Sequence, residues 1–161
     1  MRVSLLMQYA VAVVVAIAGS AMAGTLTAQG EGTYYIKYDG ACMVDSRKWP
    51  EFHNCEAASG IRWKIKHHEG AYATICGESS GKCLTTTCDK FIDLKPGRNR
   101  YSQLWRSLER DGKFKLISKI DDFEGEYTCF SKDSTFLSTI GIAESCNGSE
   151  KRQLFTIEPV A

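Results

Sequence analysis

The stretch from Gln103 to Ile117 reads Gln-Leu-Trp-Arg-Ser-Leu-Glu-Arg-Asp-Gly-Lys-Phe-Lys-Leu-Ile, and it decides the predicted fold. A tryptophan in it is followed seven residues later by a glycine, and an aromatic residue comes two positions after the glycine. The same spacing occurs upstream, in Trp63, Gly70 and Tyr72. Self-similarity of this kind is typical of repeat architectures, in which each copy is one supersecondary unit.

The two ends of the chain carry the two halves of a third copy. Gly32-Thr33-Tyr34 matches the second half, and Gln153-Leu154-Phe155-Thr156-Ile157 matches the first half. A closed threefold arrangement would divide one repeat between the termini in this way. Each unit also has a cysteine beside an apolar residue and then a large aromatic residue, and these are Cys42 with Trp63, Cys83 with Trp105, and Cys129 with Phe155. We predict that the three aromatic residues form the structural core.

The remaining segments read as short strands separated by turns. Ile61 to Lys66 alternates apolar and polar residues, as a half-buried strand does. Asp111-Gly112 is a dipeptide suited to a tight hairpin turn. We see no amphipathic helix of useful length. The pattern predicts an all-β single domain in which three units close into a small barrel with a hairpin cap, because no unit can bury its aromatic residue alone.

The N-terminus has the features of a secretory signal peptide. Arg2 supplies a positive charge, an apolar segment follows, and Ala21-Met22-Ala23 matches a small-x-small cleavage site. The unbroken apolar run from Val11 to Ala18 is too short to span a hydrocarbon core about 30 Å thick. We expect a secreted, extracellular protein with a signal peptide at 1–23, a loose leader at 24–31 and the domain at 32–161.

Charge and cysteine content limit the classes of partner and compartment. The formal net charge of +1 gives no strong field that would attract nucleic acid or an anionic membrane. The seven cysteines all follow the predicted cleavage site, and in a secreted chain they indicate disulfides that stabilise the domain. Seven is an odd number, so at least one thiol is free or pairs between chains.

The motifs resemble those of the ricin-type, or QxW, β-trefoil family. The matching segments are Gln103-Leu104-Trp105, Gln153-Leu154-Phe155, the weaker Ile61-Arg62-Trp63, and Gly81 to Thr86. The resemblance implies a β-trefoil of three pseudo-repeats in which the aromatic residue is core and the glutamine supports the fold. It also implies that disulfides join Cys42 to Cys55 and Cys129 to Cys146. The second unit has no cysteine at the matching place near Lys95, so the pairing among Cys76, Cys83 and Cys88 stays open.

Sugar-binding members of this family share an aspartate after the Cys-apolar strand, an exposed aromatic platform, and an asparagine before the glutamine. Here Asp45 follows Cys42 one place later than the pattern requires. In the other two units, Thr85 and Ser131 replace the aspartate. His53 or Glu144 stands in place of the aromatic platform. The asparagine position holds Gly60, Ser102 and Arg152. The resemblance therefore implies the fold more strongly than it implies sugar binding.

The segment from Ser46 to Asn54 is predicted to be a loop that binds a target. Its candidate binding residues, with the preceding aspartate, are Asp45, Arg47, Trp49, Phe52, His53 and Asn54. Tryptophan and arginine are common interface anchors, and Pro50 would stiffen the loop. Our first hypothesis is an effector-like secreted protein that blocks an extracellular protein, for example a host protease, by presenting this loop as protease inhibitors do. The alternatives are a lectin that uses the same loop for a glycan, and a structural or adhesive domain.

No catalytic, cofactor-binding or metal-binding motif is visible, so we expect a non-enzymatic protein without cofactors. His67 and His68 are adjacent and would point to opposite faces of a strand, which disfavours a shared metal. Asn147-Gly148-Ser149 is a possible N-glycosylation site. The basic residues near the middle of the chain are predicted to form a solvated face, and they are Arg98, Arg100, Arg106 and Arg110.

Overall fold

The computed structural model describes residue 26 and residues 30–87, 91–120, 127–133, 140–146 and 151–161. The predicted signal peptide, Cys88 and the sequon at Asn147 lie outside these residues. Within the described residues the chain forms twelve strands and two short 3-10 helices, with no α-helix. The fold is therefore all-β.

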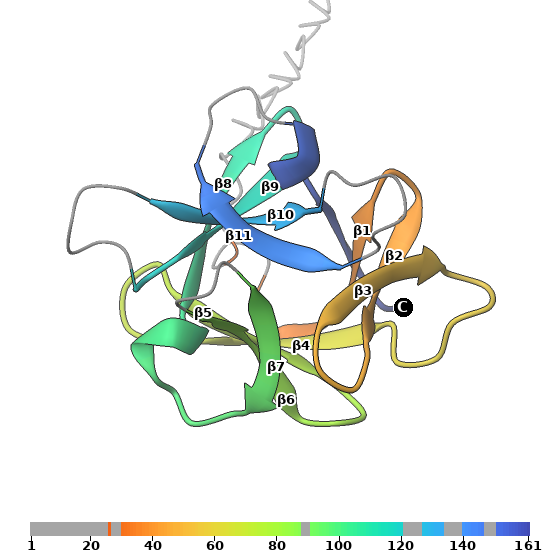
Figure 1. Cartoon of the computed structure of the whole chain (residues 1–161), viewed down its shortest axis with the longest axis horizontal. Helices are drawn as coiled ribbons and strands as arrows, with labels where there is room; N and C mark the ends of the chain where they lie inside the picture. Colours follow the sequence, from red (N-terminus) through yellow and green to blue (C-terminus); the bar gives the residue numbers. More distant parts are fainter. Residues whose placement is uncertain (1–25, 27–29, 88–90, 121–126, 134–139, 147–150) are drawn as a thin grey trace, which may run out of the picture.

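The strands fall into three units of four. Unit one consists of β1 (Gly32–Tyr38), β2 (Ala41–Asp45), β3 (Pro50–Asn54) and β4 (Arg62–His67). Unit two consists of β5 (Ala73–Gly77), β6 (Lys82–Thr86), β7 (Ile92–Pro96) and β8 (Trp105–Arg110), with η1 (Tyr101–Gln103) before β8. Unit three consists of β9 (Lys113–Ser118), β10 (Thr128–Lys132), β11 (Gly141–Ser145) and β12 (Thr156–Pro159), with η2 (Lys151–Gln153) before β12. Figure 1 shows the three units in three sectors around a common centre.

Antiparallel ladders join the units to one another. The hairpins β4–β5 and β8–β9 link consecutive units, and β12 pairs with β1. Within units, β1 pairs with β4 and β5 pairs with β8. In unit three, Phe114 and Phe155 form an isolated bridge, with backbone N···O distances of 2.7 and 2.9 Å in the two directions. This bridge replaces a regular ladder between β9 and β12, so the closed barrel remains a prediction.

The second and third strands of each unit form a hairpin, and the three hairpins contact one another. The backbone N–H of Leu94 in β7 donates to the carbonyl of Lys48, which precedes β3, over 2.7 Å. β11 and the residue just before it take part in bridges to the other two hairpins, Ile140 to Glu51 and Ile142 to Phe91. These contacts bring segments far apart in sequence to one end of the molecule.

The phased aromatic residues lie at equivalent places in the core. Trp63 and Trp105 are fully buried, and their indole N–H groups donate to the carbonyls of Met43 and Leu84 over 2.8 and 3.0 Å. Met43 and Leu84 are the apolar partners of Cys42 and Cys83, so the two units make the same bond. Phe155 is also fully buried, and its ring lies 5.0 Å from that of Phe130 between centroids. Phenylalanine has no N–H to donate, so unit three relies on ring packing instead.

Two of the three disulfides lie at equivalent places in their units, and the third has a different partner. Cys42–Cys55 and Cys129–Cys146 each close the hairpin of their own unit, in units one and three. In unit two, Cys76 in β5 bonds to Cys83 in β6, two residues that lie directly opposite each other. Gly97 occupies the place that corresponds to Cys55 and Cys146, and a Cβ there would lie 3.0 Å from the Cys83 sulfur. Six of the seven cysteines are therefore paired, and Cys88 is the seventh.

The predicted binding loop at Ser46–Asn54 is in part a strand. Pro50 is the first residue of β3, where its missing N–H is tolerated because it lies at the end of the ladder opposite Asp45. Phe52 faces inward from β3 and is 3% exposed, with its ring 5.8 Å from the Phe155 ring. The prediction that Phe52 belongs to an exposed loop is therefore wrong, because the β2–β3 register places it opposite Met43 in the core.

One residue of the predicted leader belongs to the core. Leu26 is fully buried, and its backbone N–H donates to the Ser107 hydroxyl in β8. Its carbonyl oxygen lies 3.1 Å from Nε2 of His67 in β4. The loose leader expected at 24–31 is therefore wrong for Leu26, because the apolar side chain is packed inside the domain.

Candidate functional site

The six predicted binding residues do not converge on a common cavity. Arg47, His53 and Asn54 are exposed, and His53 Nε2 lies 2.8 Å from the carboxylate of Glu51. Trp49 is only half-exposed, with its ring 6.2 Å from the ring of Phe91. None of the six lines the hollows described below. A glycan or protein contact through the exposed members of this set stays a prediction.

Asp45 does not present its carboxylate to the surface. Both carboxylate oxygens are buried and have no hydrogen-bond partner in the described part of the chain. The side chain packs on the backbone of Gly77 in β5, where an added Cβ would lie 2.0 Å from Oδ2. The predicted role of Asp45 in reading sugar hydroxyls does not fit this placement, because its acceptors face the protein interior.

The Asp45–Gly77 contact has an equivalent in each of the other units. The β1–β2, β5–β6 and β9–β10 registers align Tyr38, Gly77 and Ser118, and align Asp45, Thr86 and Lys132. In unit two, the Thr86 and Ser118 hydroxyls hydrogen-bond over 2.8 Å. In unit three, the Lys132 ammonium lies 6.0 Å from the centre of the Tyr38 ring. The same junction therefore holds a hydroxyl pair, a cation–π contact, and in unit one a carboxylate without a partner.

This comparison predicts that the protein becomes more stable when the hydroxyl pair of unit two is introduced at the equivalent positions of unit one. The double variant Asp45→Thr with Gly77→Ser is expected to raise the free energy of unfolding by about 1–3 kcal/mol, the usual cost of a buried polar group without a hydrogen bond. Gly77→Ser alone is expected to destabilise, because its Cβ would collide with the Asp45 carboxylate. Urea unfolding of the wild type, both single variants and the double variant measures the coupling. A double variant less stable than the wild type would contradict the equivalence of the two junctions.

A hollow of about 540 Å³ opens on unit two and is the best candidate for a ligand site. It lies between β6, the end of β7 and the segment that leads into β8. Its lining includes hydroxyl, amide and cationic side chains, which are Thr85, Lys95, Arg98, Arg100, Ser102 and Gln103. Two of them, Thr85 and Ser102, stand where the resemblance to the QxW lectins leads us to expect an aspartate and an asparagine.

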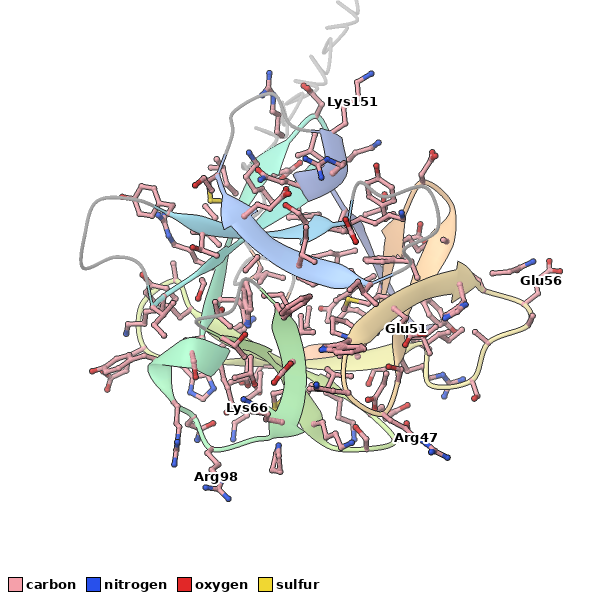
Figure 2. The ribbon with its side chains drawn as sticks, in the orientation of Figure 1. Arg47, Glu51, Glu56, Lys66, Arg98 and Lys151 are labelled. Atoms are coloured by element: carbon pink, nitrogen blue, oxygen red, sulfur yellow. A yellow bond between two sulfur atoms is a disulfide. The ribbon has the colours of Figure 1, made fainter. Side chains whose placement is uncertain are left out.

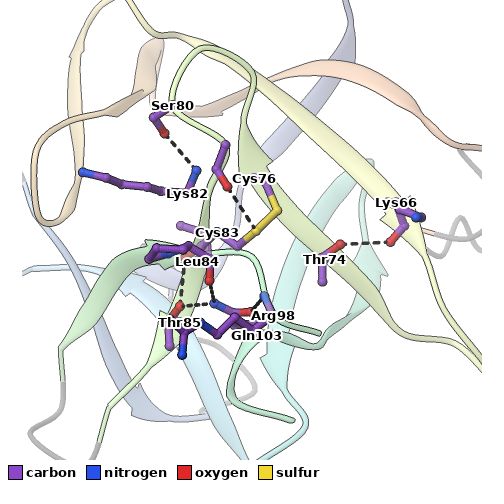
Figure 3. Close-up of a disulfide and its surroundings, with 12 residues drawn as sticks. Lys66, Thr74, Cys76, Ser80, Lys82, Cys83, Leu84, Thr85, Arg98 and Gln103 are labelled. Atoms are coloured by element: carbon purple, nitrogen blue, oxygen red, sulfur yellow. Dashed lines mark hydrogen bonds between the residues drawn. A yellow bond between two sulfur atoms is a disulfide. The ribbon is translucent and has the colours of Figure 1, made fainter. Parts of the chain in front are cut away.

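Gln103 lines this hollow, and Figure 3 shows its hydrogen bonds to Thr85 and Arg98. Its side chain is 2% exposed, and Nε2 donates to Thr85 Oγ1 at 3.1 Å and to the Pro96 carbonyl at 3.0 Å. Oε1 accepts the backbone N–H of Arg98 over 2.8 Å. The Thr85 hydroxyl in turn donates to the Cys83 carbonyl over 2.9 Å. The motif glutamine therefore holds the segment from Pro96 to Gln103 against β6.

A second hollow adjoins the first and adds an aromatic ring. Arg100, Ser102 and Ile120 line both hollows, so the two share part of their walls. Tyr101 lines the second one and is 63% exposed. The Lys119 ammonium lies 4.9 Å from the centre of the Tyr101 ring. The combined surface offers an exposed ring beside a polar, cationic cavity.

Unit one has a smaller hollow near the equivalent place, of about 280 Å³. Gly60, Arg62 and Glu78 are among the residues that line it. The Arg62 guanidinium lies 3.8 Å from the Glu78 carboxylate, so the two charges offset each other. Unit two differs because the cationic residues at its hollow outnumber the acidic ones.

The sequence alone did not locate the unit-two hollow. The sequence predicts a solvated face for Arg98 and Arg100, and both are exposed, but it does not indicate that they line a cavity. Figure 2 shows the Arg98 side chain directed away from the body of the domain, where a ligand in solution can reach it. The available signal was the placement of Pro96 to Arg100 directly before the Gln-x-Trp motif, which ties this basic segment to the motif glutamine.

Comparison with solved structures shows the fold. An endo-β-galactosidase from Clostridium perfringens that releases GlcNAcα1-4Gal matches with a TM-score of 0.69 and 12% identity, over 81% of this chain and 33% of that one. The designed 3-fold symmetric protein ThreeFoil matches with a TM-score of 0.67 and 14% identity, over 80% and 99%. SeviL, solved with the asialo-GM1 saccharide, matches with a TM-score of 0.64 and 14% identity, over 81% and 99%. The fold is a β-trefoil.

These similarities do not extend to sequence families. No protein-family model matches the chain, and no curated protein sequence matches it. This chain spans about a third of the galactosidase, so the likeness concerns one part of that enzyme.

In the described ranges, no group of three or more histidine, cysteine, aspartate or glutamate residues could hold a metal ion. No described helix is long and apolar enough to cross a membrane. The three disulfides are typical of an oxidising, extracellular environment.

Proposed function

We propose that this protein is a secreted, lectin-like β-trefoil that binds a saccharide in the hollow of unit two. The observation that carries the proposal is that Lys95, Arg98, Arg100 and Ser102 line this cavity and are not buried. Hydroxyl, ammonium and guanidinium groups of this kind supply the hydrogen bonds that orient a sugar. SeviL, which has the same fold over nearly its whole length, was solved with a saccharide bound, and this supports the proposal.

We infer a binding role rather than a catalytic one. Most glycosidases need two carboxyl groups on either side of the bond that is cleaved. The described residues that line the unit-two hollow include no carboxylate. The similarity to the galactosidase supports no enzymatic role here, because it covers only a third of that enzyme.

The first hypothesis, a protein-blocking loop presented in the manner of a protease inhibitor, has no support from the structure. It required an exposed, loop-like Ser46–Asn54, whereas β3 begins at Pro50 and Phe52 is buried. The effector-like interpretation, which rests on composition, has no support either. The lectin alternative therefore becomes the proposed function, with its site moved from unit one to unit two.

The proposal is tested by obstructing the hollow. The mature protein, residues 24–161, is expected to bind a subset of glycans on an array, and Ser102→Trp is expected to abolish this binding because the indole would fill the cavity. Ser59→Trp is the matched control, since Ser59 lines the smaller hollow of unit one. Isothermal titration on the best glycan would then compare the three proteins. Loss of binding in Ser59→Trp with retention in Ser102→Trp would place the site in unit one and contradict the proposal.

A further inference from the structure

The charges at the unit-two hollow are unbalanced. Lys95, Arg98 and Arg100 line it, and its described lining has no acidic side chain. Lys95 is partly neutralised, because its ammonium lies 3.2 Å from the Asp93 carboxylate. Arg98 and Arg100, in contrast, form no ion pair with the described residues. The chain as a whole has a formal net charge of only +1, so the cations among the described lining residues do not reflect a generally basic chain.

The two arginines are held by their backbones and leave their side chains available. The Arg98 N–H donates to Gln103 Oε1 over 2.8 Å, and the Arg100 carbonyl accepts the Gln103 N–H over 2.8 Å. Gln103 itself is buried, so both arginines are attached to a fixed point at the cavity wall. The backbone at both positions is therefore held in place at the cavity, and only side-chain rotamer freedom remains to be lost when a guanidinium binds an anion.

We propose that the ligand is an acidic oligosaccharide, with its anionic group held by Arg98 and Arg100. This inference rests on the proposed saccharide-binding function and adds the chemical class of the sugar. A carboxylate of a sialic or uronic acid and a sulfate ester share the geometry that a guanidinium recognises with two parallel hydrogen bonds. Charge-assisted bonds of this type are stronger than those that neutral hydroxyl groups form, so the acidic group dominates selectivity.

The adjoining hollow accommodates a second sugar ring. Tyr101 is exposed there, and Arg100 and Ser102 line both hollows. The face of an aromatic ring packs against the C–H groups of a pyranose while hydroxyl groups at the edge of the sugar reach polar side chains. The site therefore fits at least two sugar residues, one acidic at the arginines and one stacked on Tyr101.

Unit one lacks this preference, although its hollow also contains an arginine. Arg62 and Lys64 both approach the carboxylate of Glu78, at 3.8 and 3.9 Å. Glu78 lines that hollow and would repel an anion. The inference is thus specific to unit two.

The test uses matched saccharides on one core: lactose, sialyllactose and sulfated lactose on the same array, extended with other neutral, sialylated, uronic-acid and sulfated pairs. We expect the mature protein to bind acidic members at least about tenfold more tightly than their neutral counterparts, with the preference reduced in high salt. The sialylated, uronic-acid and sulfated arms show which anion is preferred. The variant Arg98→Gln with Arg100→Gln is expected to lose the preference, and Tyr101→Ala to weaken all binding.

The control is Arg110→Gln, which removes an exposed arginine that lines none of the three hollows and is expected to bind as the wild type does. Equal binding of neutral and acidic members would overturn the inference and leave the proposed function intact. Binding that favours acidic glycans but persists in the double arginine variant would overturn the assignment to these residues. The absence of binding to any glycan would instead overturn the proposed function.

Discussion

Replacing Trp105 with alanine is expected to lower the free energy of unfolding by about 3–5 kcal/mol, the usual range for a fully buried tryptophan. Trp105 is inaccessible to solvent, and its ring packs edge-on against Phe130 at 6.3 Å between centroids. Its indole N–H is also the partner of the Leu84 carbonyl. The variant would therefore leave both a cavity and an unpaired buried carbonyl, which together consume a large part of the stability of a small domain.

The comparison variant is Trp49→Ala, which removes the same side chain from the β2–β3 connection. Trp49 is half-exposed and contacts Phe91, with the Lys48 ammonium 4.5 Å from its ring centre. We expect a cost of about 1 kcal/mol, the scale of one partly exposed aromatic contact. Unfolding in guanidinium chloride, followed by the fluorescence of the remaining tryptophans, measures the free energy of unfolding of both variants. Equal losses in the two variants would mean that Trp49 is as much a core residue as Trp105, against the repeat-based assignment.

The threefold repeat could be predicted from the sequence, because large aromatic residues recur in it at regular spacing. Trp63, Trp105 and Phe155 can be aligned by inspection, and each must be buried for its unit to be stable. The same alignment explains why Cys42 reaches Cys55 and Cys129 reaches Cys146, since equivalent hairpins bring them together. The disulfide of unit two could not be predicted in this way, because Gly97 occupies the position of the second cysteine. Cys83 instead bonds to Cys76, which lies opposite it in the β5–β6 pair.

The nature of Ser46–Asn54 could not be predicted, because local composition and tertiary pairing disagree there. A proline between polar and charged residues favours a loop, but the partner strand β2 fixes the register and places Phe52 opposite Met43. Leu26 is a similar case, since a single apolar residue in a small, polar segment gives no periodic signal. Its burial depends on Ser107 and His67, which are remote in sequence.

The candidate site could not be predicted for a related reason. Its walls come from β6, the end of β7 and the η1 segment, and no one of these has a binding motif of its own. The sequence did show that the QxW lectin residues are absent at Thr85 and Ser102. It could not show that their replacements still line a hollow, because that depends on how Gln103 fixes the segment between β7 and β8.

Gln103→Met is expected to lower the free energy of unfolding by about 2–4 kcal/mol, although methionine has nearly the same volume as glutamine. The substitution removes acceptor and donor together and leaves the Pro96 carbonyl, the Arg98 N–H and the Thr85 hydroxyl without their partner. Each such group costs about 1–3 kcal/mol when it is kept from water, and less where water can reach it. Because methionine fills the space, the loss measures hydrogen bonds rather than a cavity.

Two measurements separate this role from a general effect on the core. Thermal unfolding gives the stability, and amide hydrogen exchange gives the protection of Arg98, whose N–H is bonded to Gln103. In Gln103→Met we expect Arg98 to lose its protection while Trp63, in unit one, keeps its own. Arg98→Gln is the control, because it changes the exposed side chain and leaves the backbone N–H in place, so its stability should match the wild type. If Gln103→Met retains both its stability and the protection of Arg98, then the motif glutamine does not hold the wall of the hollow, and the geometry that positions the two arginines would have another origin.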